Sequence, residues 1–476
     1  MLFNSVDFAI FLPIVFILYW FFVEKNLNTQ NLLLLFASYF FYAYWDYRFL
    51  LLLIFSITLD FISAKKIDGA KNDLSRKFWF CLSITINLCL LGFFKYYNFF
   101  LSSFSDAVSI FGFKLNVVTL KLILPIGISF YTFHELSYLI DVYKRRIKPV
   151  NNYIEYSLFV TFFPLLVAGP IERATHLLPQ IQKKRKFEYH NAVDGLRQIL
   201  WGLFKKIVIA DNCAQYANAI FNNSSHYSGS DHIMGAIFFA FQIYCDFSGY
   251  SDIALGTARL FGIELLKNFS YPYFSRDIAE FWRRWHISLS SWFRDYLYIP
   301  LGGSKVKTIT KIRNTFIIFL VSGFWHGANW TFIIWGLLNA IYFIPIMLLK
   351  RNRNNLEIVA KGRYFPTLKE SLGIISTFTL TIFAWIFFRA QNIGDAFKYI
   401  SEIFNRSLFT APSMHSIIFV LILFIIIEWL GREEPYPIRN LFFKFPKSIR
   451  WAFYLILILM IFNWQTTQQQ FIYFHF

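Results

Sequence analysis

The sequence predicts an all-α integral membrane protein, and three observations support that prediction. Of its 476 residues, 57% are hydrophobic, 21% are aromatic and only 16% are charged. A soluble domain carries about 25% charged residues, and so much apolar surface would not be hidden inside soluble domains of normal size. Uncharged runs long enough to cross a bilayer, about 17–25 residues, recur along the whole chain. These features exclude a soluble protein and a disordered one.

The individual runs define the expected membrane segments. The run 8–23 lies between Asp7 and Glu24 and has no small-residue cleavage site after it, so we expect a retained span rather than a signal peptide. Later uncharged runs cover residues 78–94, 371–388, 407–427 and 451–476. Residues 45–48, between the shorter runs 31–44 and 49–59, indicate a hairpin tip on the outer side.

Two further apolar segments, 122–140 and 156–171, are interrupted by proline and glycine. Such breaks are tolerated at membrane depth only where the backbone lines a cavity or is buried in protein. We therefore expect 11 to 13 membrane segments, some of them re-entrant or broken. No linker or internal repeat is visible, and we expect a single membrane domain over residues 1–476.

The distribution of positive charge predicts the orientation. Formal net charge is +18, and the basic residues fall in short loops between apolar runs, chiefly 65–77, 144–148 and 350–363. Cytoplasmic loops carry an excess of Lys and Arg, so these loops should be cytoplasmic and the N-terminus outside. The same placement favours anionic lipid over nucleic acid as the partner of the basic residues.

The most informative segment is residues 314–349, which contain no Asp, Glu, Lys or Arg but do contain His326. The run is too long for one span, and a break at 327–329 would leave about 20 Å of helix before His326. An ionisable side chain at membrane depth indicates a functional site, and desolvation would keep the imidazole neutral and able to accept a proton. Two structural alternatives remain: a histidine bonded to a neighbouring carbonyl, or one at a surface turn.

A second histidine lies in the aromatic segment 280–296. Its apolar residues recur at helical steps, and Arg283, His286, Ser290 and Arg294 recur on another face. The pattern predicts an amphipathic helix at the membrane interface. Its arginine face suits a phosphate-bearing donor, and the alternative is a lipid-headgroup anchor without a catalytic part.

Acidic residues in apolar surroundings are scarce. Asp246 and Asp252 either line a polar cavity or pair with a buried arginine, and Glu172 with Arg173 suggests a charge pair at a span end. No catalytic spacing supports more, so structural roles are favoured for these groups. The four cysteines form no CxxC or Cys/His pair, and neither a disulfide nor a metal site is predicted. No P-loop, nucleophile elbow, HExxH or GxGxxG sequence occurs.

Taken in order, a series of motifs resembles the membrane-bound O-acyltransferase family over nearly the whole chain. The resemblance extends to its bacterial branch, which contains the alginate O-acetyltransferase membrane subunit. The motifs are Met1-Leu2-Phe3-Asn4-Ser5, Pro125-Ile126-Gly127-Ile128-Ser129-Phe130-Tyr131-Thr132-Phe133, Phe163-Pro164, Ala168-Gly169-Pro170-Ile171, Asp246-Phe247-Ser248-Gly249-Tyr250-Ser251-Asp252, Arg283-Arg284-Trp285-His286-Ile287-Ser288-Leu289, Tyr298-Ile299-Pro300-Leu301-Gly302-Gly303, Trp325-His326-Gly327 and Phe387-Phe388-Arg389-Ala390. His134 stands where bacterial relatives often have Gln, a departure that does not affect the proposed chemistry.

The resemblance implies a helical membrane fold with a central tunnel and makes His326 the match to the family's invariant histidine. His286 matches the second histidine of the bacterial branch, either as a catalytic partner or as a donor-binding and structural residue. Further candidates for donor binding or the tunnel lining are Arg283, Trp325, Asn329, Ser290 and Asp246.

The function expected from this resemblance is transfer of an acyl group, acetyl above all, from a cytoplasmic thioester to a hydroxyl reached from the outer side. The donor is acetyl-CoA or an acyl-carrier thioester, with no bound cofactor. The acceptor is a cell-envelope or exported polysaccharide, or a separate extracytoplasmic acyltransferase that relays the group. The location implied is the bacterial inner membrane. The competing classes are a transporter or flippase without covalent chemistry, since broken helices and midplane polar groups suit both, and a structural scaffold.

Overall fold

A computed structural model shows a helical chain. It describes residues 1–113, 115, 119–167, 169–404, 408, 410, 412, 416–443, 445–464 and 469–474. Helices dominate these residues and none of them lies in a strand, which confirms the all-α prediction. By its contacts the chain divides into two compact units, one of Met1–Ala192 with Thr257–Leu266 and one of Val193–Gly256 with Lys267–Phe476. The expectation of a single membrane domain stays a prediction.

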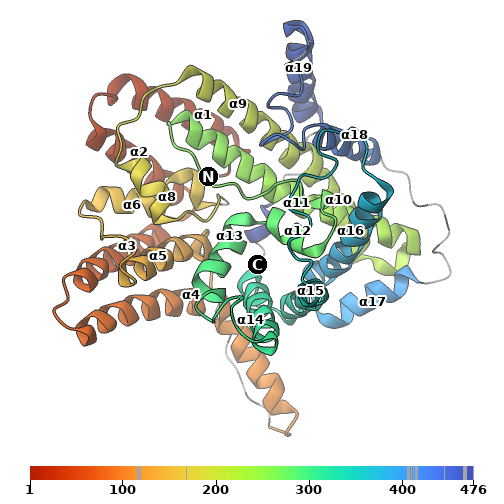
Figure 1. Ribbon diagram of the computed structural model, residues 1–476, viewed down its shortest axis with the longest axis horizontal. Helices are drawn as coiled ribbons and strands as arrows, with labels where there is room; N and C mark the ends of the chain where they lie inside the picture. Colours follow the sequence, from red (N-terminus) through yellow and green to blue (C-terminus); the bar gives the residue numbers. More distant parts are fainter. Residues whose placement is uncertain are drawn as a thin grey trace. The chain divides into compact units, whose positions relative to one another are not determined.

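The first unit is built from the N-terminal helices (Figure 1). Its elements are α1 Val6–Ile17 with the π-helical turn η1 Leu18–Phe22, α2 Leu27–Ala43, α3 Tyr47–Asp68, α4 Asp73–Ser109, α5 Ile128–Tyr143, α6 Tyr153–Thr161, α7 Phe163–Leu166 and α8 Ala174–Ile181. The helix α9 Tyr189–Leu203 leads out of this unit, and the end of α11 Gly229–Leu260 returns to it.

The predicted breaks of the first unit are confirmed. Asp46 caps α3 by accepting a hydrogen bond from the Arg48 amide, so residues 44–46 form the turn expected between α2 and α3. Gly127 begins α5 with a φ of 75°, in the left-handed region that favours glycine. The apolar segment 156–171 is divided between α6 and α7, with a break at Phe162.

The second unit carries the remaining helices (Figure 1). They are the rest of α9, the π-helical η2 Phe204–Ala210, α10 Asp211–Asn222, η3 Ser224–His226, most of α11, η4 Pro272–Phe274, α12 Ile278–Arg284, α13 Ile287–Phe293, η5 Arg294–Tyr298, α14 Thr308–His326, α15 Trp330–Leu348, α16 Leu368–Arg389, α17 Ile393–Ile403, α18 Ile417–Leu430, α19 Lys447–Asn463 and η6 Ile472–Phe474.

Four helices of the described residues are long and apolar enough to cross a bilayer: α3, α4, α15 and α16. Shorter apolar helices cover Val6–Phe22 and α18. Large side chains on the outer faces of α16 and α18 are exposed, including Ile375 and Phe419, as expected of surfaces that contact lipid. These helices support a multi-pass membrane protein, while the number of 11 to 13 membrane segments stays a prediction.

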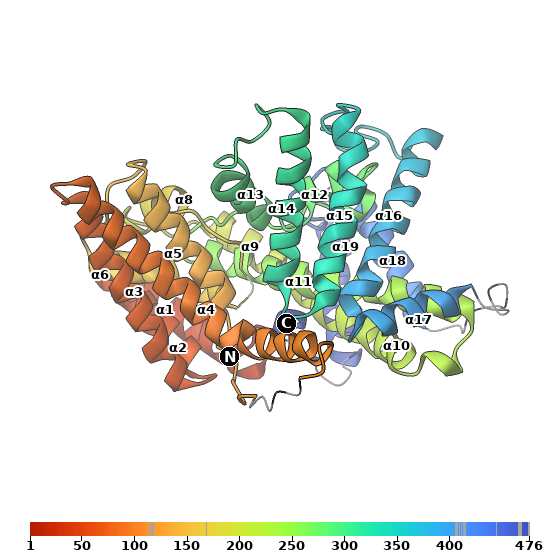
Figure 2. The same cartoon turned by 90° about the horizontal axis from the view of Figure 1, so that it is seen from below.

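The run 314–349 forms a helical hairpin. Figure 2 shows α14 and α15 side by side, with α16 next to α15. The break predicted at 327–329 is confirmed, but α14 begins at Thr308, so the helix before His326 is about 28 Å long rather than about 20 Å. Gly323 of α14 and Gly336 of α15 permit close approach, because a Cβ at either would overlap the backbone of the other helix.

The predicted span 451–476 is wrong in its second half. The helix α19 ends at Asn463, and the described part of the chain after it, residues 469–474, ends in the 3-10 turn η6. The polar residues 465–470 interrupt the apolar run and are the signal for this ending. The first part of the predicted span 407–427 includes residues outside those described, and its helix α18 begins at Ile417.

Candidate active site

His326 is the last residue of α14 and is buried, with 3% of its surface exposed. Aromatic rings enclose its imidazole on several sides. The ring centroids of Trp325, Trp335, Phe388 and Tyr473 lie 4.9, 5.0, 5.3 and 5.6 Å from that of His326. The predicted alternative of an exposed surface turn is therefore wrong, although His326 does stand at the turn between α14 and α15.

His286 lies against two of the same rings. Its ring centroid is 6.0 Å from that of Trp325 and 6.5 Å from that of Tyr473, and Phe247 of α11 covers it at 4.7 Å. The side chain is 1% exposed. The two histidines suggested by the sequence thus meet at one aromatic cluster, which we call the histidine cluster: His286, His326, Trp325 and Tyr473.

A backbone break brings His286 into the cluster. The sequence predicts one amphipathic helix over 281–296, but the structure has α12 and α13, with His286 between them at a φ of 42°. Few non-glycine residues adopt this region, and strain of this kind concentrates at functional sites. The backbone carbonyl of Asn268 accepts from the Ile287 amide, and its side chain accepts from Ser288, so the break is held by hydrogen bonds.

The predicted interface helix is corrected in a second respect. Its apolar residues are buried in protein rather than facing lipid, and Trp285 is 1% exposed. The indole of Trp285 stacks on Phe281 at 5.5 Å and lies 5.0 Å from Trp385 of α16. The periodicity was real, but it marked a core surface.

The C-terminal segment 469–474 supplies Tyr473 and is held by buried charges. Asp246 of α11 accepts a hydrogen bond from the Ile472 amide at 2.7 Å and pairs with Lys206 at 2.8 Å. Lys206 also pairs with Asp211 at 2.8 Å and donates to the Gln469 carbonyl at 3.1 Å. Asp246 therefore pairs with a buried cation, which is a lysine rather than the expected arginine, and fixes the segment that carries Tyr473.

A cavity of about 600 Å³ lies beside α14. Lys311 and Ser322, about 16 Å apart along that helix, both line it. Ser322 stands one turn before His326 and on the same face of α14. Apolar and aromatic side chains form much of the wall, including Trp282 and Phe319. Trp282 in turn contacts Trp335, the ring that lies beside His326.

The mouth of this cavity is basic. Its lining includes Arg294, Lys311, Lys350 and Arg353, and no carboxylate is among the lining residues of the described chain. Convergent cations at the opening of a low-dielectric cavity attract an anionic ligand. Phosphate is the group that arginine and lysine commonly bind. Ser290, a predicted donor-binding residue, lines this cavity.

Arg283 takes a different position. Its guanidinium donates to the carbonyls of Asn352 and Asn355, both at 2.7 Å, and so attaches α12 to the loop before α16. It is not among the residues that line the cavity. Its predicted contact with the donor stays a prediction, whereas the visible contacts position the loop that contains Lys350 and Arg353.

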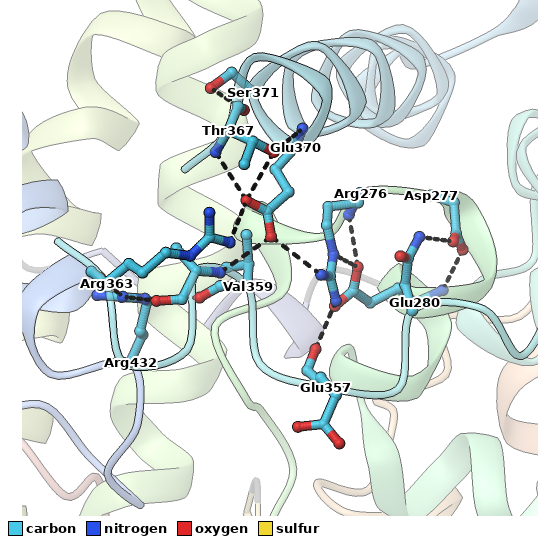
Figure 3. Close-up of polar contacts among 12 residues, drawn as sticks. Arg276, Asp277, Glu280, Glu357, Val359, Arg363, Thr367, Glu370, Ser371 and Arg432 are labelled. Carbon is cyan, nitrogen blue, oxygen red and sulfur yellow. Dashed lines mark hydrogen bonds and ion pairs between the residues drawn. The ribbon is translucent and has the colours of Figure 1, made fainter. Parts of the chain in front are cut away.

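A charged network holds the same loop from the other side (Figure 3). Glu370, in the first turn of α16, pairs with Arg363 at 3.0 Å and with Arg276 at 3.5 Å. Arg276 pairs with Glu280 of α12 at 3.0 Å and donates to the Glu357 carbonyl. The network therefore ties α12, the loop and α16 together at the basic end of the cavity.

The remaining predicted residues have structural contacts. Asn329 caps α15 by accepting from the Thr331 amide and donates to the Gln391 carbonyl at 2.7 Å. Asp252 pairs with Lys205 at 2.5 Å. In the first unit, Glu172 pairs with His176 at 2.7 Å and accepts a hydrogen bond from the Leu266 amide. The prediction named only Arg173 as its partner, so these two contacts are additional.

Sequence reasoning placed Arg294 on a donor-binding face but missed Tyr473 and the other three cations of the cavity. Tyr473 was absorbed into a presumed span, and only the polar stretch before it signals that the chain leaves the helix there. The cations belong to three separate segments, around 294, 311 and 350–353, and no spacing along the chain shows that they converge.

A helical membrane protein with two buried histidines in one aromatic cluster, next to a basic-mouthed cavity, is the class that fold and site define. Comparison with known proteins specifies the class further. The profile of the membrane-bound O-acyltransferase family matches residues 82–393, and the chain belongs to that family. It is an acyltransferase of the membrane, as the resemblance implied.

Individual relatives agree. The chain is 39% identical to a peptidoglycan O-acetyltransferase of Helicobacter pylori over 427 residues, which cover 84% of this chain and 79% of the relative. It is also 39% identical to a probable alginate O-acetylase of Pseudomonas aeruginosa over 404 residues, 84% of this chain and 74% of that one. A teichoic acid D-alanyltransferase of Bacillus subtilis is 27% identical over 280 residues, 57% and 70% of the two chains.

Proposed function

We propose that the protein moves an acetyl group from a phosphate-bearing thioester, through the histidine cluster, to a hydroxyl on the opposite side of the membrane. The observation that carries this proposal is the position of His326. It is buried one helical turn beyond Ser322, and Ser322 lines a cavity whose mouth carries four cations. The relatives named above act on peptidoglycan, alginate and teichoic acid, which supports a cell-envelope or exported polysaccharide as the final acceptor.

Charge distribution supports the direction of transfer. Residues 305–313 carry four basic residues (Lys or Arg) and no acidic residue. Residues 350–363 carry five basic residues and one acidic residue, Glu357. At the other end of the α14–α16 bundle, residues 327–329 carry no charge, and residues 389–398 carry two basic residues, Arg389 and Lys398, and the acidic Asp395. The positive-inside rule therefore favours a cytoplasmic mouth for the cavity and an outer position for the turn after His326. An inner membrane location with the N-terminus outside is part of this proposal.

In the proposed step, His326 accepts the proton of the acceptor hydroxyl while that oxygen attacks the thioester carbonyl. The carbon–sulfur bond breaks, an ester bond forms, and the proton passes to the departing thiolate, so that a free thiol is released. General-base catalysis of this kind contributes about 10²–10⁴-fold. No nucleotide hydrolysis is needed, because the thioester itself is the activated group.

His286 and Tyr473 complete the cluster. His286 contacts the same two rings as His326, which supports a role as its catalytic partner or as a donor-binding and structural residue. Tyr473 brings a phenol beside both imidazoles. Acetyl-CoA and an acyl-carrier thioester both carry phosphate next to the thiol-bearing arm, and the basic mouth suits either donor.

The test uses purified protein in nanodiscs with radiolabelled acetyl-CoA and a soluble hydroxyl acceptor. Release of free thiol and formation of a labelled ester are expected in equal amounts. If sealed vesicles containing the protein instead accumulate an intact solute and no thiol is released, the proposal is overturned in favour of transport.

A double substitution tests the donor site. Lys350→Gln with Arg353→Gln should raise the KM for the thioester about tenfold and leave kcat near its normal value, because the lost contacts bind the donor but do not take part in the chemistry. Lys361→Gln is the matched control, since Lys361 belongs to the same loop but pairs with exposed Glu357 outside the cavity. Equal KM values in all three proteins would remove the basic mouth from donor binding.

A further inference from the structure

The second unit contains another cavity, at the C-terminal end of α16. The loop with Lys350 and Arg353 lies before the N-terminal end of this helix. The cavity has a volume of about 220 Å³, and Phe221, Arg389, Gln391, Asp395, Lys398 and Tyr399 are among its lining residues. These residues come from the end of α10, the end of α16 and the helix α17. Two cations and one carboxylate belong to this lining, so the pocket has a positive balance without being uniformly basic. We call it the Arg389 pocket.

The guanidinium of Arg389 is held in a fixed position. It donates to the Asn218 side chain at 2.7 Å and lies 5.5 Å from the centroid of the Phe221 ring. The Phe221 ring also stacks on that of Tyr399, at 4.0 Å and 11°. The Tyr399 hydroxyl is in turn fixed by the His232 carbonyl at 2.8 Å. Such preorganisation lowers the cost of binding a ligand.

The charge of Arg389 is not neutralised within the described chain. Asn218 is neutral, and no carboxylate of the described residues lies within ion-pair distance of the half-buried guanidinium. Asp395, which lines the same pocket, accepts from the Asn392 side chain at 2.8 Å. Arginine offers five N–H donors in a planar fork that matches carboxylate and phosphate groups. A half-buried arginine without an acidic partner is therefore a receptor for an oxyanion.

The pocket is next to the histidine cluster. Phe388, the neighbour of Arg389 in α16, has its ring centroid 5.3 Å from that of His326. Gln391, which lines the pocket, accepts a hydrogen bond through its carbonyl from Asn329, three residues after His326. His326 thus lies between two cavities, with the basic-mouthed cavity before it along α14 and the Arg389 pocket after it.

We propose that the Arg389 pocket binds an oxyanion on the hydroxyl-rich acyl acceptor and thereby brings an acceptor hydroxyl to His326. The oxyanion is the carboxylate of a sugar acid or the phosphate of a polyol phosphate polymer, two sources of the same chemistry. Polar side chains and one carboxylate around Arg389 and Lys398 provide partners for neighbouring hydroxyls. That the pocket delivers an acceptor hydroxyl to His326 rests on the proposed acyl transfer. That the pocket binds an oxyanion rests on its geometry alone.

A structural role for Arg389 alone explains less of this geometry. A cation at the C-terminus of a helix interacts favourably with the helix dipole. However, its hydrogen bond within the described residues goes to Asn218 of α10, and its planar face is used by Phe221. Arg389 has further N–H groups, and its side chain lines an open pocket. A purely structural role does not use these donors.

Equilibrium binding tests the pocket without any catalysis. The probes are D-glucuronate, glycerol 3-phosphate and neutral glucose, each titrated into the full-length protein in nanodiscs and followed by ligand-observed NMR. We expect one or both anionic probes to bind and glucose to bind at least tenfold more weakly. Arg389→Gln should weaken the anionic probes about tenfold or more. Lys369→Gln removes a cation from the exposed opposite end of the same helix and should change nothing.

The outcomes are distinct. Preference for glucuronate or for glycerol 3-phosphate supports the proposal and identifies the source of the oxyanion. Equal binding of all three probes, or unchanged binding in Arg389→Gln, overturns it. Should Arg389→Gln fail to fold, Lys398→Gln is used instead, because Lys398 is exposed on α17 and is expected to weaken the anionic probes severalfold. Unchanged binding in that variant then overturns the proposal.

Transfer kinetics test the role of the pocket. With an acidic acceptor, Arg389→Gln should raise the acceptor KM about tenfold while the KM for the thioester is unchanged. A protein that binds the anionic probes but never releases thiol would refute the proposed acyl transfer and leave the binding site standing. A protein that transfers acyl groups equally well to acidic and neutral acceptors, with no response to Arg389→Gln, would refute the pocket and leave the acyl transfer standing.

Discussion

Substituting Asp246 by alanine should release the C-terminal segment from the histidine cluster. The substitution removes the acceptor of the Ile472 amide and one of the two carboxylates that pair with Lys206. A buried N–H left without its acceptor costs about 1–3 kcal/mol. Because 1.4 kcal/mol corresponds to a factor of ten, the ratio of attached to released segment should fall about 5- to 150-fold. Tyr473 would then leave the neighbourhood of His326 for part of the time.

Hydrogen exchange measured by mass spectrometry reports the segment directly, and thiol release from acetyl-CoA reports the chemistry. In Asp246→Ala, the peptide containing Ile472 should exchange faster and kcat should fall, with the KM for the thioester little changed. Asp246→Asn keeps a carbonyl oxygen for the Ile472 amide and should restore part of the protection and of the rate.

Asp252→Ala is the matched control for this experiment. Asp252 is a second carboxylate of α11 with its own lysine partner, Lys205, and it has no contact with the segment among those described. It should leave the exchange of the C-terminal peptide unchanged. Unchanged exchange in Asp246→Ala, or an equal loss of kcat in both variants, would refute the reasoning and reduce Asp246 to a general stabiliser of the fold.

Three further predictions concern other parts of the molecule. Gly323→Ala should lower the free energy of unfolding by about 1–3 kcal/mol, because the new Cβ would overlap the Phe332 carbonyl; an unchanged thermal midpoint in detergent would contradict this. The hydrogen bond that His176 donates to Glu172 raises the pKa of His176, and burial raises the pKa of Glu172. Both groups therefore lose stabilisation as pH rises through their folded-state pKa values. The loss begins above about pH 4.5 for Glu172 and above about pH 6.5 for His176, so the thermal midpoint should fall as pH rises, and its fall above about pH 6.5 should be smaller in His176→Asn; identical pH profiles would exclude the pair as the cause. Tyr473→Phe should lower the transfer rate without lowering the thermal midpoint, and a full rate would remove the phenol from the site.

Much of the fold could be predicted from local patterns. Hydrophobic runs and their interruptions indicated the membrane helices, the break after His326 and the break before α5, because a break in a membrane helix needs proline, glycine or a polar capping residue close in sequence. Composition alone excluded a soluble protein. The amphipathic pattern of 281–296 was misread, since the same periodicity fits a lipid-facing surface and a buried one. Only the tertiary partners Phe269 and Trp385 distinguish the two.

The site was predicted less completely. His326 and His286 were indicated by motifs, and their meeting at Trp325 and Tyr473 required the three-dimensional structure. Asp246 was noticed as a charge in an apolar context, but its function as the anchor of the C-terminal segment depends on a contact between residues 226 positions apart. Such long-range contacts leave no signature in a single sequence.

The most direct test of the account is thiol release by His326→Ala. The account predicts a loss of about 10²–10⁴-fold in transfer, with an unchanged thermal midpoint and an unchanged KM for acetyl-CoA. His190→Ala, which removes an exposed histidine of α9, should keep the full rate. If His326→Ala transfers acetyl groups as fast as the unsubstituted protein, His326 is not the general base, and the central claim of acyl transfer through the histidine cluster is wrong.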